Sequence, residues 1–444
     1  MKNKKLKILV LSVCFLLIST LVTHGSATKK QLIIWYYGDQ EAAGTKEWID
    51  KAAREYESEN PEIRVTPILI GHMEIVTNMQ NAGAAQTGPD IGFGYAGTWT
   101  MDMVFRGWAA PLSDYWSEEE LNHMIGKEVV TWKDKVWAYN FFAGVHPIMY
   151  NRKHFQQVGI PTLKNHQWSW EELIDACEKL KKSGRIPIAI GALVGMPAWF
   201  MSTFGTQYLD KTERVVELVT GEESFKDPDF SQYLEKVYSL AQKGYFNEGS
   251  TSLDFPQSWE LFAAQKASMT WVAGASVVRE YAEAVGGVEN VGLLKSLAVY
   301  GDGKMADDPL VYAKHLFITK WSRNKELAAD FLRYLSTPEK SNEFYSETGI
   351  PLLNDQCDLT LWPEGSPERI LASWTKKSTS IVGAEAMFPF EMGIECLNVP
   401  VQAILTGEAT TEEAVEMSDE GAEKWRRENP EMIDIYREWG EAQR

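Results

Sequence analysis

The sequence has few cysteines, and their number and spacing exclude a fold held together by disulfides. Only four occur in 444 residues. The three that lie beyond the N-terminal segment, Cys177, Cys357 and Cys396, show no metal-ligand spacing, and at most one disulfide can form among them. The seven histidines are scattered as well, so the sequence gives no support for a metal site.

The sequence also lacks the short motifs of common enzymes. It contains no His-Glu-x-x-His, no Gly-x-Ser-x-Gly and no phosphate-binding Gly-x4-Gly-Lys. Acidic pairs such as Glu118/Glu120 and Glu412/Glu413 fall in the first turns of expected helices, where the helix dipole favours a solvated carboxylate. We therefore expect no catalytic residues, no metal and no cofactor.

Basic residues are fewer than acidic ones, with 44 Lys and Arg against 62 Asp and Glu. The formal net charge is -18 at neutral pH, which disfavours nucleic acid or an anionic membrane surface as a partner. The composition is otherwise that of a globular protein, with 44% hydrophobic and 24% charged residues. A chain this long exceeds what one hydrophobic core usually organises, so two domains are expected.

Residues 1–27 differ from the rest of the chain and are typical of a cleaved signal peptide. Four lysines and an apolar run precede three small residues that a signal peptidase can read: Lys2, Lys4, Lys5, Lys7, then Ile8–Val22, then Gly25-Ser26-Ala27. The run is shorter than the about 20 residues of a membrane-spanning helix. Val13 disfavours a lipid anchor on Cys14, because a lipobox has a small residue there. We expect export to the periplasm or the cell-surface exterior and cleavage after Ala27, which removes four lysines and changes the formal charge from -18 to -22.

The following segment alternates extended and helical patterns. Apolar runs at Leu32–Tyr37, Ile63–Ile70 and Pro89–Tyr95 are typical of buried strands, and segments with helical spacing link them. This alternation predicts a parallel sheet with right-handed crossovers. Ligands bind beyond the carboxyl ends of parallel strands, which indicates the loops Gly38–Gly44 and Tyr95–Trp99.

The long apolar and aromatic stretch Val136–Phe155 organises the rest of the chain. Gly144 and Pro147 interrupt it, which predicts two extended segments joined by a bend. We interpret Ala143–His146 as the first place where the chain crosses between two lobes. The alternative is one buried strand of a single large sheet.

A series of short motifs spread from about residue 30 to 420 resembles the extracellular solute-binding proteins of ABC transporters, the branch that includes maltose-binding protein. Each motif is weak alone, but all occur in the family's order. They are Gly38-Asp39-Gln40, Asn60-Pro61, Gly88–Ile91, Gly107–Asp114, Tyr150–Lys153 with Gly159–Pro161, Trp168–Leu173, Phe262–Met269, Ser322–Leu332, Gly349–Pro351, Leu405–Gly407 and Glu412–Ala414.

The resemblance implies an α/β, two-lobe, periplasmic-binding-protein-like type II fold with three interlobe crossings. We place these near Ala143–His146, Thr270–Val272 and Ala313–Leu316. Lobe 1 would comprise residues 28–144 and 271–315, and lobe 2 residues 145–270 and 316–444. A solute would be trapped between the lobes by hinge closure and handed to the permease subunits of an ABC transporter at the membrane. We expect a monomer.

Two departures from the family pattern bear on the ligand. Maltose-binding relatives often carry Gly-x-Trp after the second crossing, where Gly274-Ala275-Ser276 stands here. They also place an acidic residue after the third strand, where Gly97-Thr98 stands. The pocket is therefore not expected to be a maltose pocket.

Aromatic content is the feature that indicates a ligand class. The chain has 17 Trp, 17 Tyr and 18 Phe, and sugar rings stack their C–H faces on aromatic planes while their hydroxyls need polar partners. The candidate ligand-binding residues lie in or beside the expected cleft segments: Asp39, Gln40, Tyr95, Thr98, Trp99, Phe142, His146, Trp199, Trp271, Glu391 and Met392.

The expected cleft segments contain neither Arg nor Lys, although anionic ligands usually meet such a side chain or a helix N-terminus. A neutral mono- or oligosaccharide is therefore the predicted ligand. Two alternatives stay open, namely a receptor for a glycerol-phosphate-like anion and a secreted glycosidase, which also needs aromatic residues and paired carboxylates.

Overall fold

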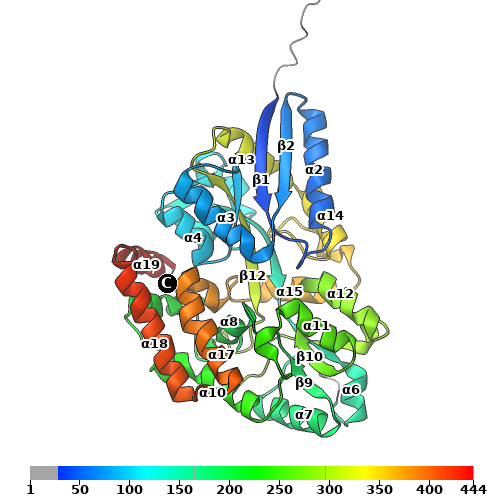
Figure 1. Ribbon diagram of the computed structural model, residues 1–444. Coiled ribbons are helices and arrows are strands. Elements are labelled where there is room, and N and C mark those ends of the chain that lie inside the picture. The colour runs from blue at the N-terminus through cyan, green and yellow to red at the C-terminus, as the bar shows by residue number, and fades with distance from the viewer. Residues whose placement is uncertain (1–28, 162, 164–165, 296, 444) are drawn as a thin grey trace, which may run out of the picture.

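The two larger of three β-sheets lie toward opposite ends of the molecule, and the third pairs only β5 with β6 (Figure 1). The computed structural model describes residues 29–161, 163, 166–295 and 297–443, so the expected signal peptide and its cleavage site lie outside the described residues. The first sheet has the order β2-β1-β3-β12-β4, with β7 also paired to β12, and the second has the order β11-β8-β10-β9. Among the described residues, no helix is both long enough and apolar enough to span a bilayer.

The N-terminal half of the first sheet has the predicted alternation of strands and helices. Its elements are β1 Lys30–Tyr36, α2 Thr45–Glu59, β2 Ile63–Leu69, α3 His72–Ala85 and β3 Ile91–Tyr95. Both β2 and β3 pair parallel to β1, so the loops after β1 and β3 emerge at the same edge of the sheet. Gly92, Gly94 and Gly97 have the spacing of a dinucleotide-binding fingerprint, but the first two lie inside β3 rather than in the turn after it.

The chain then completes the first lobe and passes to the second. The elements are α4 Thr98–Phe105, β4 Ala109–Ala110, η1 Leu112–Asp114, α5 Glu118–Asn122, η2 Lys127–Val130, β5 Thr131–Trp132, β6 Lys135–Val136 and β7 Tyr139–Val145. Val145 of β7 pairs with Val311 in the first sheet, whereas Ile148 of β8 (Ile148–Asn151) pairs with Trp271 in the second. The chain therefore passes from the first sheet to the second between Val145 and Ile148, at the end of the segment Ala143–His146, and its strands do not form a single large sheet.

The second sheet is surrounded by helices. In chain order these elements are α6 Arg152–Gln157, α7 Trp170–Lys182, β9 Ile186–Ala189, α8 Met196–Phe200, the π-helix η3 Met201–Gly205, η4 Thr212–Val215, α9 Val216–Thr220, α10 Pro228–Gln242, η5 Ser250–Ser252, α11 Phe255–Ala263, β10 Ala267–Trp271, α12 Gly274–Ala284, η6 Val288–Asn290 and β11 Val291–Leu294.

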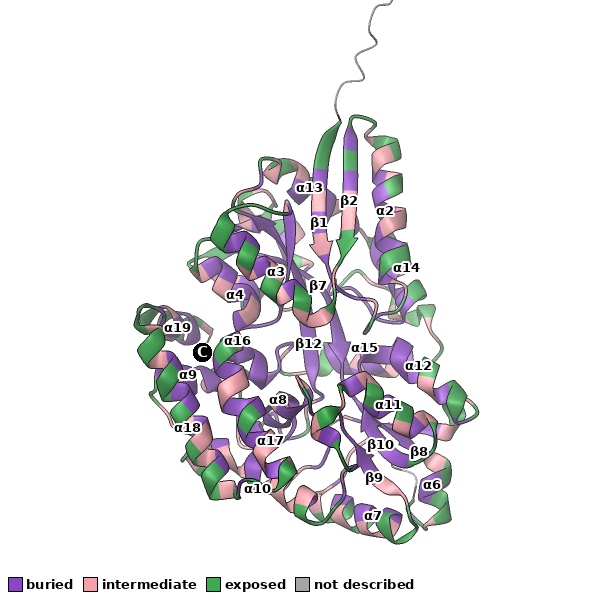
Figure 2. Ribbon diagram, in the orientation of Figure 1, coloured by how far each residue is buried: buried purple, intermediate pink, exposed green. Residues whose placement is uncertain are grey.

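After β12 Val311–Thr319 the chain is helical to its end. The remaining elements are α13 Lys325–Leu335, α14 Pro338–Thr348, η7 Leu359–Leu361, α15 Pro367–Lys377, η8 Ala384–Met387, α16 Phe390–Gly393, the π-helix η9 Ile394–Asn398, α17 Val399–Thr406, α18 Thr411–Glu428 and α19 Pro430–Gln443. Helices α13 and α14 pack on the first lobe, whereas α17 and α18 pack on α10 of the second. Every residue of β7 and β12 is buried, and these strands lie in the middle of the molecule (Figure 2).

Strand pairing differs from the expected lobe ranges in two places. Residues 270–271 end β10, and the next strand, β11, rejoins the same sheet by pairing with β8, so Thr270–Val272 is not a passage between sheets. Residues 313–316 lie inside β12, which pairs with β3, β4 and β7 of the first sheet, so the passage comes before this strand. Pairing between distant strands decides these boundaries, and apolar runs alone do not encode it.

We propose a revised division on this basis. Lobe 1 would comprise residues 29–145 and 311–354, since Asn354 forms a bridge with Met124. Lobe 2 would comprise residues 146–310 and 382–443, since α17, α18 and α19 pack on α9 and α10. The number of interlobe crossings stays a prediction.

Candidate functional site

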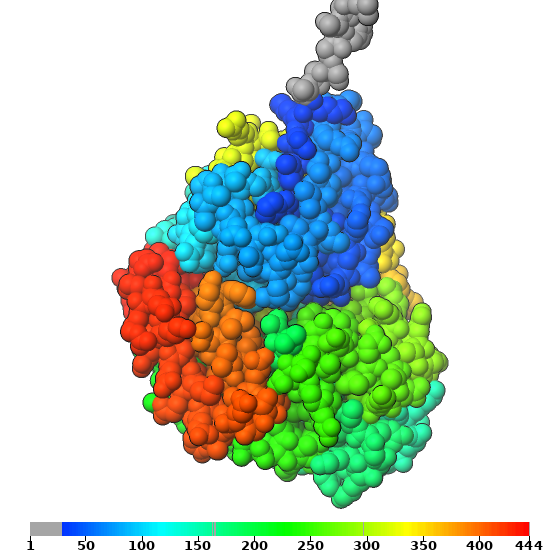
Figure 3. All heavy atoms as spheres, in the orientation of Figure 1, coloured from blue at the N-terminus to red at the C-terminus, as the bar shows by residue number. Residues whose placement is uncertain are grey.

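A cavity, called here the cleft cavity, lies between the lobes beyond the carboxyl ends of β1 and β3. Its free volume is about 50 Å³, far below the roughly 300 Å³ or more of most small-ligand pockets. A ligand therefore requires the lobes to separate or the side chains to rearrange. Figure 3 shows the N-terminal part of the chain in contact with later segments along the boundary between the lobes, called here the seam. The described lining residues are Glu41, His72, Met73, Tyr95, Trp99, His146, Val194, Gly195, Ala198, Trp199, Phe255, Tyr312, Glu385, Phe390, Gly393, Ile394, Leu397 and Asn398.

Aromatic rings form much of the cavity wall. Tyr95, at the end of β3, meets Trp99 edge to face with ring centroids 5.5 Å apart, and Trp99 meets Phe390 at 5.1 Å. On the other side of the cavity, the centroids of His146 and Trp199 are 4.6 Å apart. These rings come from both lobes, so the lobes together offer apolar surfaces on which a flat, partly apolar ligand can pack.

One ring contact crosses the seam directly. His72, at the start of α3 in the first lobe, lies 5.7 Å from Phe255 at the start of α11 in the second, measured between ring centroids. Burial lowers the pKa of His72 to about 4, although the Glu41 carboxylate opposes this shift. The imidazole is therefore neutral at physiological pH and packs as an aromatic ring.

A buried ion pair lies beside the cavity. Lys314 Nζ donates to Glu41 Oε2 and, at 3.3 Å, to the Tyr312 carbonyl, and the Tyr37 hydroxyl donates to Glu41 Oε1 at 3.2 Å. Burial alone would raise the pKa of Glu41, but the Lys314 ammonium and His146 hold it well below its ordinary value. The two charges cancel, so the pair adds no net charge to the cleft. Removing one partner of such a pair costs about 3–5 kcal/mol.

A β-bulge places Lys314 at this position. The register of β12 against β7 shifts between Lys314 and His315, so that Phe141 of β7 has no partner. Bulges of this kind change the direction of nearby side chains and recur beside functional sites. Gly144 leaves room for the pair, since an added Cβ would lie 3.3 Å from both Glu41 Oε2 and Lys314 Nζ.

The segment 381–388 carries Glu385 to the cavity and is bonded to both lobes. From the first lobe, Thr98 Oγ1 donates to the carbonyls of Ala386 and Phe388 at 2.9 and 2.6 Å. From the second, Ser202 Oγ of η3 accepts from the Glu385 amide at 3.4 Å. The position of Glu385 therefore depends on how the two lobes sit against each other.

Several buried polar atoms of the cavity have no hydrogen-bond partner among the described residues. They are both carboxyl oxygens of Glu385, Asn398 Oδ1 and both ring nitrogens of His146. His146 Nε2 is 3.6 Å from Glu41 Oε2, longer than a hydrogen bond. Burial raises the pKa of Glu385 to about 8, although the Tyr312 hydroxyl opposes this. Unpaired buried polar atoms are costly, so they mark places where a ligand can supply partners.

Four of the predicted ligand-binding residues line the cleft cavity: Tyr95, Trp99, His146 and Trp199. The first two follow β3, as the rule for parallel strands predicts. His146 follows β7, at the passage between lobes, and Trp199 lies on α8 of the second lobe. The structure brings these residues together from four separate segments.

Three other predicted polar residues lie near the cavity but serve different contacts. Asp39 Oδ1 accepts from the amides of Gly44 and Lys46 at 3.3 and 3.2 Å, at the start of α2. Thr98 holds the segment 381–388, as described above. Glu391 is exposed and accepts from Gln80 Nε2 at 3.1 Å.

The remaining predicted residues do not line the cavity. Gln40 is exposed, whereas Phe142, Trp271 and Met392 belong to the hydrophobic core. Trp271 packs against Phe200 with ring centroids 5.5 Å apart. Ser276, at the place where maltose-binding relatives often carry Trp, instead donates to the Glu41 carbonyl at 3.1 Å.

Seven residues of the site are not among the candidates named from the sequence, although Glu41 lies in the predicted loop Gly38–Gly44: Glu41, His72, Phe255, Tyr312, Lys314, Glu385 and Asn398. Two signals were present. Glu41 directly follows the predicted pair Asp39-Gln40, and Lys314 is a charged residue inside an apolar extended run. The expected cleft segments without Arg or Lys did not include this strand. No Arg or Lys is among the described residues that line the cavity, but Lys314 lies beside it.

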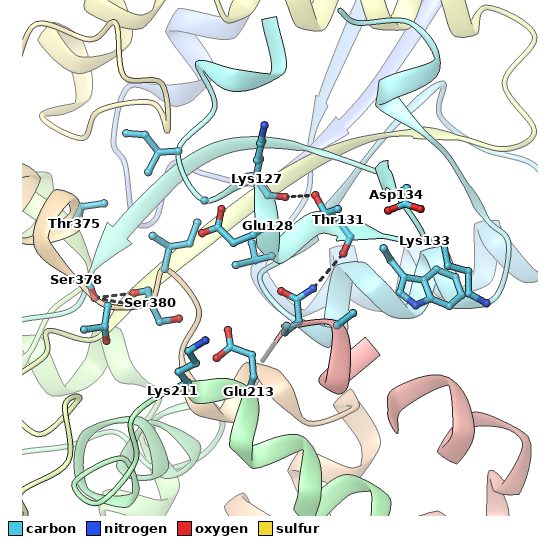
Figure 4. Close-up of a pocket in the computed structure, with 18 of the residues that line it drawn as sticks. Lys127, Glu128, Thr131, Lys133, Asp134, Lys211, Glu213, Thr375, Ser378 and Ser380 are labelled. Carbon is cyan, nitrogen blue, oxygen red and sulfur yellow. Dashed lines mark hydrogen bonds between the residues drawn. The ribbon is translucent and has the colours of Figure 1, made fainter. Parts of the chain in front are cut away.

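A second, larger cavity of about 720 Å³ lies between η2 and β5 of the first lobe and η4 and α19 of the second (Figure 4). Its charged lining residues are four lysines and four acids: Lys127, Lys133, Lys211, Lys376, Glu128, Asp134, Glu213 and Glu438. Gln443 Nε2 of α19 donates to the Thr131 carbonyl at 3.2 Å across it. The balanced charges and the single ring, Trp132, make it less suited to a sugar than the cleft cavity. No group of three or more His, Cys, Asp or Glu in the described part of the chain is arranged to hold a metal ion.

Comparison with known proteins identifies relatives and solved structures that are similar to this chain. The sn-glycerol-3-phosphate-binding periplasmic protein UgpB of Escherichia coli (strain K12) is 24% identical over 417 residues, covering 84% of this chain and 87% of the relative. A solved chitin oligosaccharide binding protein has a TM-score of 0.75 at 20% identity, covering 89% of this chain and 99% of its own. An ABC transporter solute-binding protein from Thermotoga lettingae TMO bound with alpha-D-tagatose has a TM-score of 0.71 at 19% identity, with 89% and 99% coverage.

These solved structures share the two-lobe fold described above. A model of the bacterial extracellular solute-binding protein family matches residues 39–341, which include the loop after β1, the passage between lobes and β12. The chain therefore belongs to the bacterial extracellular solute-binding proteins of ABC transporters.

Proposed function

We propose that this protein is the extracytoplasmic receptor of an ABC importer and that it captures a neutral mono- or oligosaccharide by hinge closure. One observation carries the proposal. The cleft cavity combines aromatic rings from both lobes with unpaired polar atoms, and no Lys or Arg is among its described lining residues. Such a surface suits a ligand that offers apolar faces and hydroxyl groups.

Electrostatics supports a neutral ligand. Lys314, the cation beside the cavity, is bonded to Glu41, and burial lowers the pKa of both His72 and His146. An anionic phosphate would normally meet a free Arg or Lys. The closed geometry supports capture by closure, because the cavity of about 50 Å³ is too small for a ligand to enter without movement.

A glycerol-phosphate receptor is the second candidate, favoured by the name of the Escherichia coli relative. Unless a helix N-terminus held the phosphate, it would require Lys314 to exchange Glu41 for the phosphate, which leaves a buried carboxylate unpaired. A secreted glycosidase is less well supported, since the family is one of binding proteins.

Isothermal titration calorimetry of the mature protein tests the proposal. The panel comprises chitin oligosaccharides, tagatose and other neutral sugars, with sn-glycerol 3-phosphate and amino acids as competing classes. We expect one neutral sugar to bind near the micromolar range, about -8 kcal/mol. At a hundredfold excess over Kd it should stabilise the fold by about 2.7 kcal/mol. Tight binding of sn-glycerol 3-phosphate with every neutral sugar silent would refute the proposal, and release of reducing sugar would indicate the glycosidase.

A further inference from the structure

The unpaired atoms of the cleft cavity define what a ligand must offer. Glu385 contributes two carboxyl oxygens and Asn398 contributes Oδ1, and all three accept hydrogen bonds when the carboxyl is ionised. We propose that Glu385 is the specificity-determining residue of the cleft and that it accepts hydrogen bonds from two adjacent hydroxyl groups of a neutral sugar. This inference rests on the proposed function and specifies two adjacent hydroxyl groups as the feature of the sugar that the receptor recognises.

Close contacts around Gly383 restrict the position of the Glu385 carboxyl. An atom added at Gly383 would lie 2.8 Å from Glu385 Oε2, 2.8 Å from the Tyr312 ring and 3.0 Å from Ser202 Oγ. The absence of a side chain at Gly383 therefore makes room for this carboxyl. Glu385 is only 3% exposed, so solvent cannot supply the missing partners in this closed form. Two adjacent sugar hydroxyls supply two donors at the spacing of two carboxyl oxygens.

Neighbouring charged groups do not serve as partners for Glu385. The elements packed on η8 are η3, η4, α4 and α16, and η3 carries no titratable side chain. Their charged residues are bonded elsewhere: Arg214 of η4 to Asp229, Asp102 of α4 to Arg106, and Glu391 of α16 to Gln80. Glu213 of η4 lines the second cavity. From β12, the Tyr312 hydroxyl favours the charged form of Glu385 but does not outweigh burial.

The other titratable groups of the cleft do not change this balance. Glu41 is paired with Lys314, and the buried imidazoles of His72 and His146 are held toward the neutral form. Glu385 is therefore the acid in the described cavity lining that has no cationic partner, and the Tyr312 hydroxyl only partly offsets its burial.

A measurable proton linkage follows. In an open cleft, solvated Glu385 has the ordinary pKa of about 4.3, whereas burial without partners raises the pKa to about 8. Between these pH values, Glu385 takes up a proton when the cleft closes around a ligand that lacks the two adjacent hydroxyl donors. The affinity for such a ligand therefore falls as pH rises through this range. A ligand with the donor pair stabilises the carboxylate, so its closure takes up no proton and its affinity stays level.

The test compares the parent protein with Glu385→Gln by calorimetry at about pH 6 and about pH 8. The probes are the neutral sugar selected by the screen above and its singly deoxygenated derivatives. Glu385→Gln should bind the full sugar roughly tenfold or more weakly than the parent. One derivative should bind the parent roughly tenfold or more weakly than the full sugar, lose further affinity at the higher pH, and take up a proton. Buffers with different ionisation enthalpies report that uptake.

Glu385→Gln should not distinguish this derivative from the full sugar. Glu213→Gln is the matched control, because burial also raises the pKa of Glu213 but this carboxyl lines the second cavity; its binding should equal that of the parent. Thermal unfolding confirms that both variants are folded. If the parent binds neutral sugar and Glu385→Gln binds it equally well, the inference is overturned and the proposed function stands. If the parent binds no neutral sugar, the proposed function fails and this inference fails with it.

Discussion

Trp199 and Trp271 are two predicted ligand contacts that the fold places in different surroundings. Trp199 lines the cleft cavity, where its ring meets His146 at 4.6 Å. Trp271 is 1% exposed and packs on Phe200, and its carbonyl accepts from Trp259 Nε1 at 2.6 Å. The fold therefore places one tryptophan in the wall of the cleft cavity and the other in the core.

Alanine substitutions separate these two roles. Trp199→Ala should weaken binding of the selected sugar by about 1–3 kcal/mol, because the ring's contact with the ligand is lost, with a small change in the free energy of unfolding. Trp271→Ala should lower the free energy of unfolding by about 3–5 kcal/mol, because it opens a cavity in the core. Calorimetry and urea denaturation measure the two effects. Equal loss of affinity in both variants, at equal stability, would contradict this assignment.

At the residue scale, the sequence predicts those cavity-lining side chains that lie at or just after the end of a predicted strand. Tyr95 and Trp99 belong to this group, because the edge of a parallel sheet is predictable from the order of strands and helices. Glu385 does not, because its position depends on Thr98, 287 residues earlier, which bonds the carbonyls of Ala386 and Phe388 just after it. No local pattern encodes such a contact, and Glu385 therefore emerges only from the folded chain.

At the scale of elements, the sequence predicts strands and helices well where their pattern is local. It does not predict which sheet each strand joins. The alternation from β1 to β3 follows from runs of apolar residues and helical spacing. By contrast, β11 joins β8 and not the first lobe, and β12 carries a register shift beside Lys314. Both features depend on pairing between strands more than 100 residues apart, which a single sequence does not show.

The loop between β3 and α4 joins the first lobe to the segment 381–388, and Gly97 allows this contact. Its φ is +66°, and an added Cβ would lie 2.4 Å from the Ala386 carbonyl oxygen. Gly107 has a similar φ of +72° but no atom within 4 Å of an added Cβ. The two glycines therefore share a positive φ and differ in the collision.

Gly97→Ala should therefore destabilise the closed form, whereas Gly107→Ala should not. Both variants should lose at least about 1 kcal/mol of unfolding free energy, because each glycine has a positive φ. Only Gly97→Ala should also weaken sugar binding, by roughly tenfold or more, because it displaces the segment that carries Glu385. Calorimetry at matched folded fractions measures this difference. Equal affinities for the two variants would show that the contact at Ala386 does not matter for closure.

At the scale of the whole molecule, contacts between the lobes are dispersed along the seam. They include Gln80 to Glu391 at 3.1 Å and Ser276 to the Glu41 carbonyl at 3.1 Å near the cleft cavity. Elsewhere, α19 reaches the first lobe through the ring pair Phe105–Tyr436 at 5.3 Å. Such contacts are individually weak, so under the proposed hinge closure a ligand that binds only the closed form would shift the balance between open and closed forms.

Small-angle scattering tests this closure directly. With the selected sugar at saturation, the radius of gyration of the mature protein should fall toward the roughly 22 Å of a compact chain of this length, because bridging contacts to both lobes exist only when they are together. A sugar that does not bind in calorimetry is the control and should leave the radius unchanged. Trp199→Ala should need more sugar but reach the same final radius, since the variant weakens binding and leaves the lobes intact. If the parent binds sugar with no change in radius, the two lobes do not close on the ligand, and capture must occur by side-chain rearrangement within an already closed cleft.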